Sequence, residues 1–270
     1  MEDDLPLFFK ISLAEWSLHK ELRKGVMTNL DFPGIAKNRY GIGAIEFVNQ
    51  FFMDKAEDTG YLHELKSECN QQGVHCHLIM VDGEGELDDP NPAHRQIAIT
   101  NHHKWVRAAS YLSCSSIRVN IKSSGDAEIV KVSAIDGLRR LCAYASEFGI
   151  NVIVENHWGH SSNGKWITGV IRSVDCLNCG TLPDLGNFDT YDRYLGVEEM
   201  MPFAKGVSAK ANNFDDQGKE TVIDYVRMLK IVKQARFDGY IGIEYEGEVL
   251  NEEDGIKATK ALLLKVGRVL

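Results

Sequence analysis

The fold is decided by the stretch SIRVNIKSSGDAEIVKVSAIDGLRRLCAYASEFGINVIVEN, residues 116–156. It begins and ends with short, β-branched apolar runs, 116–121 and 151–156, which are typical of buried strands. Between them, apolar residues of segment 128–149 recur at three- and four-residue steps, as on an amphipathic helix, and Gly149 favours its end. This apolar stripe consists of Ile129, Val132, Ile135, Leu138, Leu141 and Cys142. The stretch therefore predicts a strand, a helix and a second strand.

The same alternation extends along the chain. Six further strands are predicted at 8–13, 42–48, 74–81, 180–185, 206–211 and 240–245, and further helical segments at 54–72, 91–113, 193–204, 221–239 and 252–268. Eight strands that alternate with helices predict a parallel sheet, which right-handed crossovers close into a barrel. An open doubly wound sheet is the alternative, but the first strand–helix turn lacks its glycine-rich phosphate loop. We therefore predict an α/β protein with a single (β/α)8 TIM-barrel domain over residues 1–270.

Composition restricts the partners. The net charge of −9 disfavours nucleic acid, which is bound by clustered Lys and Arg. No apolar run approaches the roughly 18 residues that a membrane span needs. The start MEDDLPLFF lacks the features of a signal peptide, so we expect a cytoplasmic protein, with a periplasmic one as the alternative if a leader has been removed. Of six cysteines, only Cys176 and Cys179 form a CxxC, without a second pair, which favours reduced thiols in the core.

Polar side chains follow four of the predicted strands, at the barrel edge where catalytic groups collect. The fifth strand ends in Glu155, and the sixth in Asp184 with Asn187 just beyond. The remaining ones are Ser208 and Lys210 on the seventh strand and Glu244 and Glu246 on the eighth, each pair on one face. The acidic loop after the third strand places Asp82 and Glu84 nearest the predicted barrel rim, where they either line the mouth or belong to a solvated loop.

Three carboxylates that converge at a barrel mouth repel one another unless they are neutralised. Protonation, pairing with Lys210 and Arg118, or a divalent cation would each do this. Oxygen-rich sites suit Mg²⁺ or Mn²⁺, and a nearby imidazole extends the choice to Co²⁺ or Zn²⁺. Glu155, Asp184 and Glu244 are therefore candidate metal ligands.

The segments VIVENHWG, TLPDLGNF, GVSAKANNFD and GYIGIEYEGE resemble the successive strand-end motifs of the xylose isomerase-like TIM barrels. These include sugar (phosphate) isomerases and epimerases, inosose dehydratases and an AP endonuclease. The resemblance runs over nearly the whole chain and implies Glu155, Asp184 and Glu244 as ligands, with a homodimer as a family-level expectation. Ser208 stands where the family's usual fourth ligand, a His, would lie, and Asn187 occupies a place often held by His. Ser208 is therefore a weak metal ligand at best.

The resemblance also implies a mechanism. The metal polarises a carbonyl, and Glu155 or Glu244 removes the neighbouring proton to give an enediolate. Lys210 is expected to stabilise that enediolate or a leaving hydroxyl. The candidates for binding the carbohydrate substrate are His157, His160, Asn187, Arg118, Glu246, Trp16 and Glu46.

Four functions compete on this basis. A metal-dependent isomerase or epimerase of a ketose, keto-sugar or sugar phosphate is the leading one. A lyase that dehydrates a keto-inositol or keto-sugar uses the same enolising chemistry. A nuclease is disfavoured, because the imidazoles of a multi-zinc cluster are replaced and the charge is acidic. The last is a non-catalytic sugar-binding barrel, against which the retained carboxylates argue.

Overall fold

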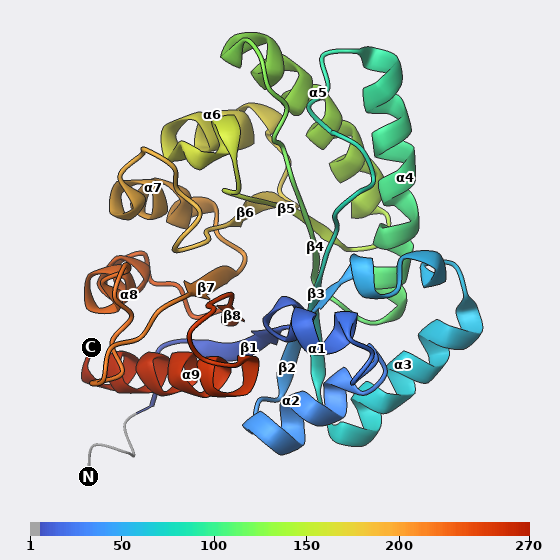
Figure 1. The fold of residues 1–270 in the computed structure, drawn as a ribbon. Coiled ribbons are helices and arrows are strands. Elements are labelled where there is room, and N and C mark those ends of the chain that lie inside the picture. Colours follow the sequence, from blue (N-terminus) through green and yellow to red (C-terminus); the bar gives the residue numbers. More distant parts are fainter. Residues whose placement is uncertain (1–5) are drawn as a thin grey trace.

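Eight strands form one curled sheet in the computed structural model, which describes residues 6–270 (Figure 1). Their order is β6-β5-β4-β3-β2-β1-β8-β7, and every paired neighbour is parallel. The strands are β1 Lys10–Ala14, β2 Ala44–Val48, β3 His75–Met80, β4 Ser116–Val119, β5 Asn151–Glu155, β6 Cys179–Leu182, β7 Val207–Ala211 and β8 Tyr240–Tyr245. The predicted barrel is confirmed, with strand positions shifted by a few residues.

Helices surround the sheet and connect successive strands (Figure 1). They are α1 His19–Arg23, α2 Phe32–Tyr40, α3 Thr59–Gln72, α4 Pro92–Tyr111, α5 Ala127–Ser146, α6 Gly164–Val174, α7 Arg193–Met200, α8 Tyr225–Gln234 and α9 Glu252–Val269. From α3 to α9, each helix begins after an Asp or Asn whose side chain accepts a hydrogen bond from a backbone N–H of the first turn. Within residues 6–270, none of the helices combines the length and the apolar character that a membrane span requires.

The core lies in two places. Most buried apolar side chains pack between the strands and the surrounding helices. A smaller group fills the interior of the barrel and consists of Ala14, Val48, Leu78, Met80, Ile153 and Leu182. This interior layer forms an apolar support beneath the polar side chains at the carboxyl ends of the strands.

The barrel closes between β6 and β7 through loop backbone. Lys205 N donates to Thr181 O over 3.0 Å, and Ser208 N donates to Pro183 O over 2.9 Å. Leu185 N donates back to Ser208 O over 3.0 Å, and two parallel bridges join Thr181 to Ala204 and Asp184 to Ser208. We call these contacts the β6–β7 seam. The loop that carries Asp184 is therefore also the part of the chain that joins the two ends of the sheet.

Two sequence-based expectations about helices were wrong. Ile129 and Val132 were assigned to the buried stripe of α5, but their side chains are 57% and 68% exposed. Leu138, Leu141 and Cys142 are buried as predicted, whereas the first turns of α5 bury Val130, Ser133 and Ala134. Helix α6 was not predicted, because Gly164 and Gly169 weaken its helical signal. At Gly164 a Cβ would lie 2.6 Å from the Cα of Gly196 in α7, so close helix packing requires the glycine.

The six cysteines are free, and five of them are buried. Cys176 and Cys179 flank the turn between α6 and β6, where Cys179 is buried and Cys176 is partly exposed.

Candidate active site

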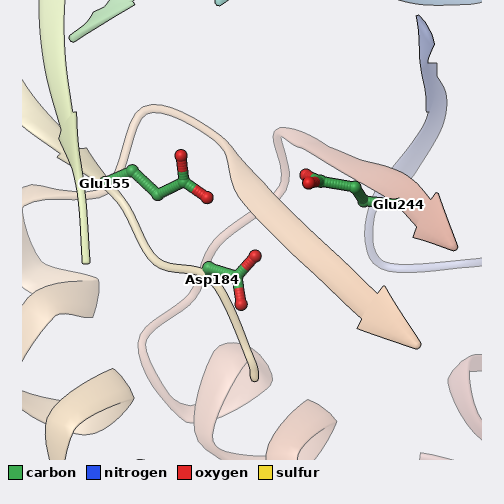
Figure 2. A group of neighbouring side chains, drawn as sticks. All are labelled: Glu155, Asp184 and Glu244. Atoms are coloured by element: carbon green, nitrogen blue, oxygen red, sulfur yellow. The ribbon is translucent and has the colours of Figure 1, made fainter. Parts of the chain in front are cut away.

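Three buried carboxylates converge at the carboxyl ends of the strands. Glu155 ends β5, Asp184 follows β6 and Glu244 lies in β8. Figure 2 shows the three side chains pointing toward one another from separate strands. Each offers an oxygen, and these oxygens all lie within 4.8 Å of one another. The side chains are nearly inaccessible, with residue exposures of 1%, 0% and 5%.

The position of Asp184 is fixed by its own loop. The Asn156 side chain accepts from Asp184 N over 2.7 Å and donates to Asp184 O over 2.9 Å. Asp184 Oδ1 in turn accepts from the backbone of Gly186 and Asn187, over 2.7 and 2.8 Å. This leaves Oδ2 directed at the site. Gly186 is required here, because a Cβ would lie 2.7 Å from the Lys210 side chain.

Glu155 has few partners. Arg118 Nε lies 3.0 Å from Glu155 Oε2, but the pair lacks hydrogen-bond geometry, and that oxygen accepts no hydrogen bond. Asn187 donates to the other oxygen over 3.3 Å. Arg118 is shared with Asp82, whose Oδ1 lies 2.7 Å from its guanidinium. Burial raises the pKa of Glu155 well above its usual range, and Arg118 opposes this only in part.

Glu244 is held much more firmly. Lys210 Nζ donates to its Oε1 over 2.7 Å, and Ser208 Oγ lies 2.8 Å from its Oε2. Burial alone would raise the pKa of Glu244, but Lys210 and Ser208 outweigh burial and lower it. Ser208 Oγ also lies 3.0 Å from Asp184 Oδ2, and Lys210 Nζ lies 3.6 Å from it. Burial, opposed by Lys210, raises the pKa of Asp184 to about 6.

The donor set fits a divalent cation. Around the three ligands, five carboxylates face two cations, which leaves an excess of three negative charges when all are ionised. The buried Glu155 Oε2 accepts no hydrogen bond and is a free donor for a metal. Carboxylate and hydroxyl oxygens are hard ligands that suit Mg²⁺ or Mn²⁺, and Ser208 is already engaged by two of the carboxylates. The carboxylates are Asp82, Glu155, Asp184, Glu244 and Glu246, and the cations are Arg118 and Lys210.

A cavity of about 590 Å³ lies next to the carboxylate cluster, and Glu244 is the cluster member that lines it. Several residues chosen from the sequence line it, and the chain adds others from the loops after β2, β3 and β5. Trp16 Nε1 donates to Glu246 Oε1, and Lys210 Nζ lies 3.1 Å from Glu246 Oε2. The lining residues are Trp16, Val48, Gln50, Met53, Met80, Asp82, Gly83, Arg118, Lys122, His157, Trp158, Asn187, Lys210, Glu244 and Glu246.

The two histidines of the fifth-strand loop lie in different places. His157 lines the cavity, and its buried Nδ1 has no hydrogen-bond partner. Burial, together with Arg118 and Lys210, lowers the pKa of His157 to about 4, so its imidazole is neutral at pH 7. His160 does not line this cavity: its Nε2 bonds Gly125 O over 2.9 Å.

Glu46 lies inside the barrel and is absent from the cavity lining. Ser12 Oγ donates to its Oε1 over 2.6 Å, while its Oε2 has no partner. Burial raises the pKa of Glu46 to about 8. A Cβ at Gly242 would lie 2.4 Å from Glu46 Oε1, so this strand position requires glycine.

The sequence analysis left Asp82 between the barrel mouth and a solvated loop, and it gave no role to Asn156. The Asp82 side chain is 18% exposed and holds Arg118, so it belongs to the mouth. It lies two residues after the end of β3, close to the strand end as Glu155 is. Asn156 positions Asp184 through its backbone, which no sequence signal indicated. Glu84 is buried too, and pairs with Lys104 over 2.7 Å, away from the cavity.

Known proteins share this architecture. The family model of the xylose isomerase-like TIM barrel matches residues 36–266. The fold is similar to that of the IOLI protein with a bound zinc atom, at 14% identity over 96% of this chain and 98% of that chain, with a TM-score of 0.78. D-allulose 3-epimerase from Methylomonas sp. aligns at 14% identity over 97% and 99%, with a TM-score of 0.76. The probable 3-DHS dehydratase AsbF from Bacillus anthracis aligns at 15% over 94% and 98%, with a TM-score of 0.73. A search of curated proteins gives no significant match.

Proposed function

This chain belongs to the xylose isomerase-like TIM barrel family, and from that premise we propose that it is a divalent-metal-dependent isomerase or epimerase. Its substrate is a ketose, a keto-sugar or a sugar phosphate. The observation that carries the proposal is the convergence of Glu155, Asp184 and Glu244 next to a 590 Å³ cavity, whose lining includes Glu244. The structural neighbours named as an epimerase and a zinc-bound protein support the same chemistry.

The three carboxylates would hold the cation, with Ser208 as a hydroxyl beside them. Such a cation polarises a substrate carbonyl and makes the neighbouring C–H more acidic. The other polar residues of the site would contact the substrate around the cation. His157 and Asn187 lie at the cavity wall, where a neutral imidazole and an amide can hold sugar hydroxyls.

Glu155 and Glu244 transfer the proton in this proposal. They come from different strands, and their carboxylate oxygens lie within 4.8 Å of each other, so that one removes a proton next to the carbonyl and the other returns one. Lys210, whose ammonium lies 2.7 Å from Glu244, stabilises the negative charge that develops on the substrate oxygen. Return of the proton to another carbon gives isomerisation, and return to the other face gives epimerisation.

Dehydration is the second candidate. The observation that favours it is Lys210, because a buried ammonium at the cavity floor can also stabilise a hydroxyl that leaves from the carbon beyond the enolised one. The neighbour named as a probable dehydratase supports this alternative. Both reactions begin with removal of the same type of proton.

The first test measures metal content in the purified protein and in Glu155→Ala/Glu244→Ala, with Glu248→Gln as a matched control. Glu248 is 84% exposed in its side chain and pairs with Lys20 outside the cavity lining. We expect near-stoichiometric divalent metal in the wild type and in the control, and none in the double variant. The absence of metal from all three, even after incubation with Mn²⁺, Mg²⁺, Co²⁺ or Zn²⁺, would leave a metal-free or merely sugar-binding barrel.

A further inference from the structure

The cations at the cavity floor are already neutralised by protein carboxylates. The Arg118 guanidinium contacts Asp82 at 2.7 Å and Glu155 at 3.0 Å. The Lys210 ammonium lies 2.7 Å from Glu244 and 3.1 Å from Glu246. Recognition of a phosphate requires such groups to be available for charge-assisted hydrogen bonds. Here each of them would have to leave a carboxylate, at a cost that the incoming phosphate must offset.

Glu246 presents a carboxylate at the cavity wall. Lys210 and the Trp16 indole hold its two oxygens, and its side chain remains 32% exposed where it lines the cavity. A carboxylate oxygen accepts more than one hydrogen bond, so Glu246 can accept from a substrate hydroxyl. The same negative charge repels a phosphate monoester. Trp16 adds an aromatic surface beside this acceptor.

The helix N-termini beyond β7 and β8 are also unsuited to an anion. In (β/α)8 barrels, the loops after these strands and a nearby helix N-terminus frequently form a phosphate site. Here Asp224 caps α8 by accepting from Arg227 N over 3.0 Å. Helix α9 is capped by Asn251, and its first turn contains three acidic residues, Glu252, Glu253 and Asp254. Negative side chains thus occupy both positions where a phosphate would bind.

Lys122 is the remaining cation among the described residues of the lining. Its ammonium lies 5.7 Å from the centre of the Trp158 ring, and the Trp158 side chain is largely exposed at the cavity mouth. It is a single ammonium at the outer edge, whereas Arg118 and Lys210, the other cations of the lining, already contact carboxylates. Lys122 nevertheless offers a place for an anionic group, so the experiment must include it.

We infer that the substrate is an unphosphorylated polyhydroxy ketone and that Glu246 determines this specificity by accepting from a hydroxyl and repelling phosphate. This inference depends on the enolising activity of the proposed function. Of the three proposed substrate classes, it excludes the sugar phosphates.

The test follows exchange of carbon-bound hydrogen with D₂O by NMR, for the metal-loaded protein with ketohexoses and with the 6-phosphates of the same sugars. Glu246→Gln removes the negative charge at nearly constant shape, and Glu248→Gln serves as the matched control. We expect much faster exchange with the free ketoses than with their phosphate esters. In Glu246→Gln, we expect kcat/KM for the free sugar to fall roughly 10- to 100-fold, since a hydrogen bond to a charged group contributes roughly 1.5–3 kcal/mol. The ratio of free sugar to phosphate ester should fall at least tenfold as well, while Glu248→Gln keeps both values.

Three outcomes overturn the inference in distinguishable ways. Exchange that is faster with the phosphate esters, and that Lys122→Met abolishes, leaves the proposed function intact and assigns anion recognition to Lys122. An unchanged ratio in Glu246→Gln removes Glu246 from specificity. The absence of exchange with both kinds of sugar overturns the proposed function itself, and this inference with it.

Discussion

Glu155 and Glu244 are the same residue type with nearly the same burial, 1% and 5% exposed, yet their pKa values move in opposite directions. Burial raises the pKa of Glu155, whose nearest cation is shared with Asp82. Burial acts on Glu244 as well, but Lys210 and Ser208 reverse its effect. Side chains from neighbouring strands, rather than depth in the barrel, therefore set the direction in which the pKa of each carboxylate moves.

Strand register explains the difference. Lys210 and Glu244 are direct partners in the β7–β8 pair, so the ammonium lies opposite the carboxylate. In the β4–β5 pair, Arg118 is opposite Ile153, two residues before Glu155. Its guanidinium therefore reaches Glu155 from below and also contacts Asp82. Both cations contact more than one carboxylate, but Glu244 lies directly opposite Lys210 and accepts its hydrogen bond, whereas Glu155 is out of register with Arg118.

The largest expected effect on activity follows from replacing either glutamate by Gln. We expect kcat to fall by about 10³-fold in both Glu155→Gln and Glu244→Gln, because general acid–base groups contribute roughly 10²–10⁴-fold. The two variants should differ in stability, since only Glu244→Gln leaves the buried Lys210 ammonium without its closest partner. Steady-state kinetics and urea denaturation measure the two effects. A fully active double variant would rule out the proton-transfer pair.

The partners of the two carboxylates can be compared directly. Lys210→Met removes the closest cation of Glu244, and we expect a loss of about 3–5 kcal/mol in the free energy of unfolding of the metal-free protein. Asn187→Ala removes a 3.3 Å hydrogen bond to Glu155, and we expect a loss of about 1 kcal/mol. Urea denaturation monitored by tryptophan fluorescence gives both values. Equal losses would contradict the asymmetry between the two sides of the site.

Glu46 is a third buried glutamate, and it has no paired cation among the described residues. Burial raises its pKa from 4.5 to about 8, so the folded state retains a proton that the unfolded chain loses near pH 4.5. Its effect on stability is therefore least unfavourable below pH 4.5 and becomes more unfavourable as the pH rises to about 8. We expect Glu46→Gln to reduce the loss of stability between pH 5 and pH 8 by on the order of 2 kcal/mol. Urea titrations of wild type and variant at these two pH values measure this, and parallel curves would show that Glu46 is ionised in the fold.

The sequence was sufficient to predict the barrel, because its strands follow local apolar patterns. Polar residues near the carboxyl ends of these strands selected Glu155, Asp184 and Glu244, and their roles stay a prediction. The contacts of Asp82 with Arg118 and of Glu246 with Trp16 were not predicted, because they join segments 36 and 230 residues apart. Such pairs depend on strand register and on loop paths, neither of which a single sequence displays. His160 was selected for its neighbourhood in sequence, but a one-turn helix at Gly159–Ser162 directs its ring toward Gly125.

The β6–β7 seam has a consequence for how the protein assembles. Asp184 and Ser208 form one of the two bridges that close the barrel, and their side chains also meet at the carboxylate cluster. A folding chain in which β7 has not yet reached β6 therefore has no complete site, so barrel closure and site formation are one event. An ion bound between Asp184 and Glu244 would link the two ends of the sheet. Its affinity would then contribute to the persistence of the closed barrel as well as to chemistry.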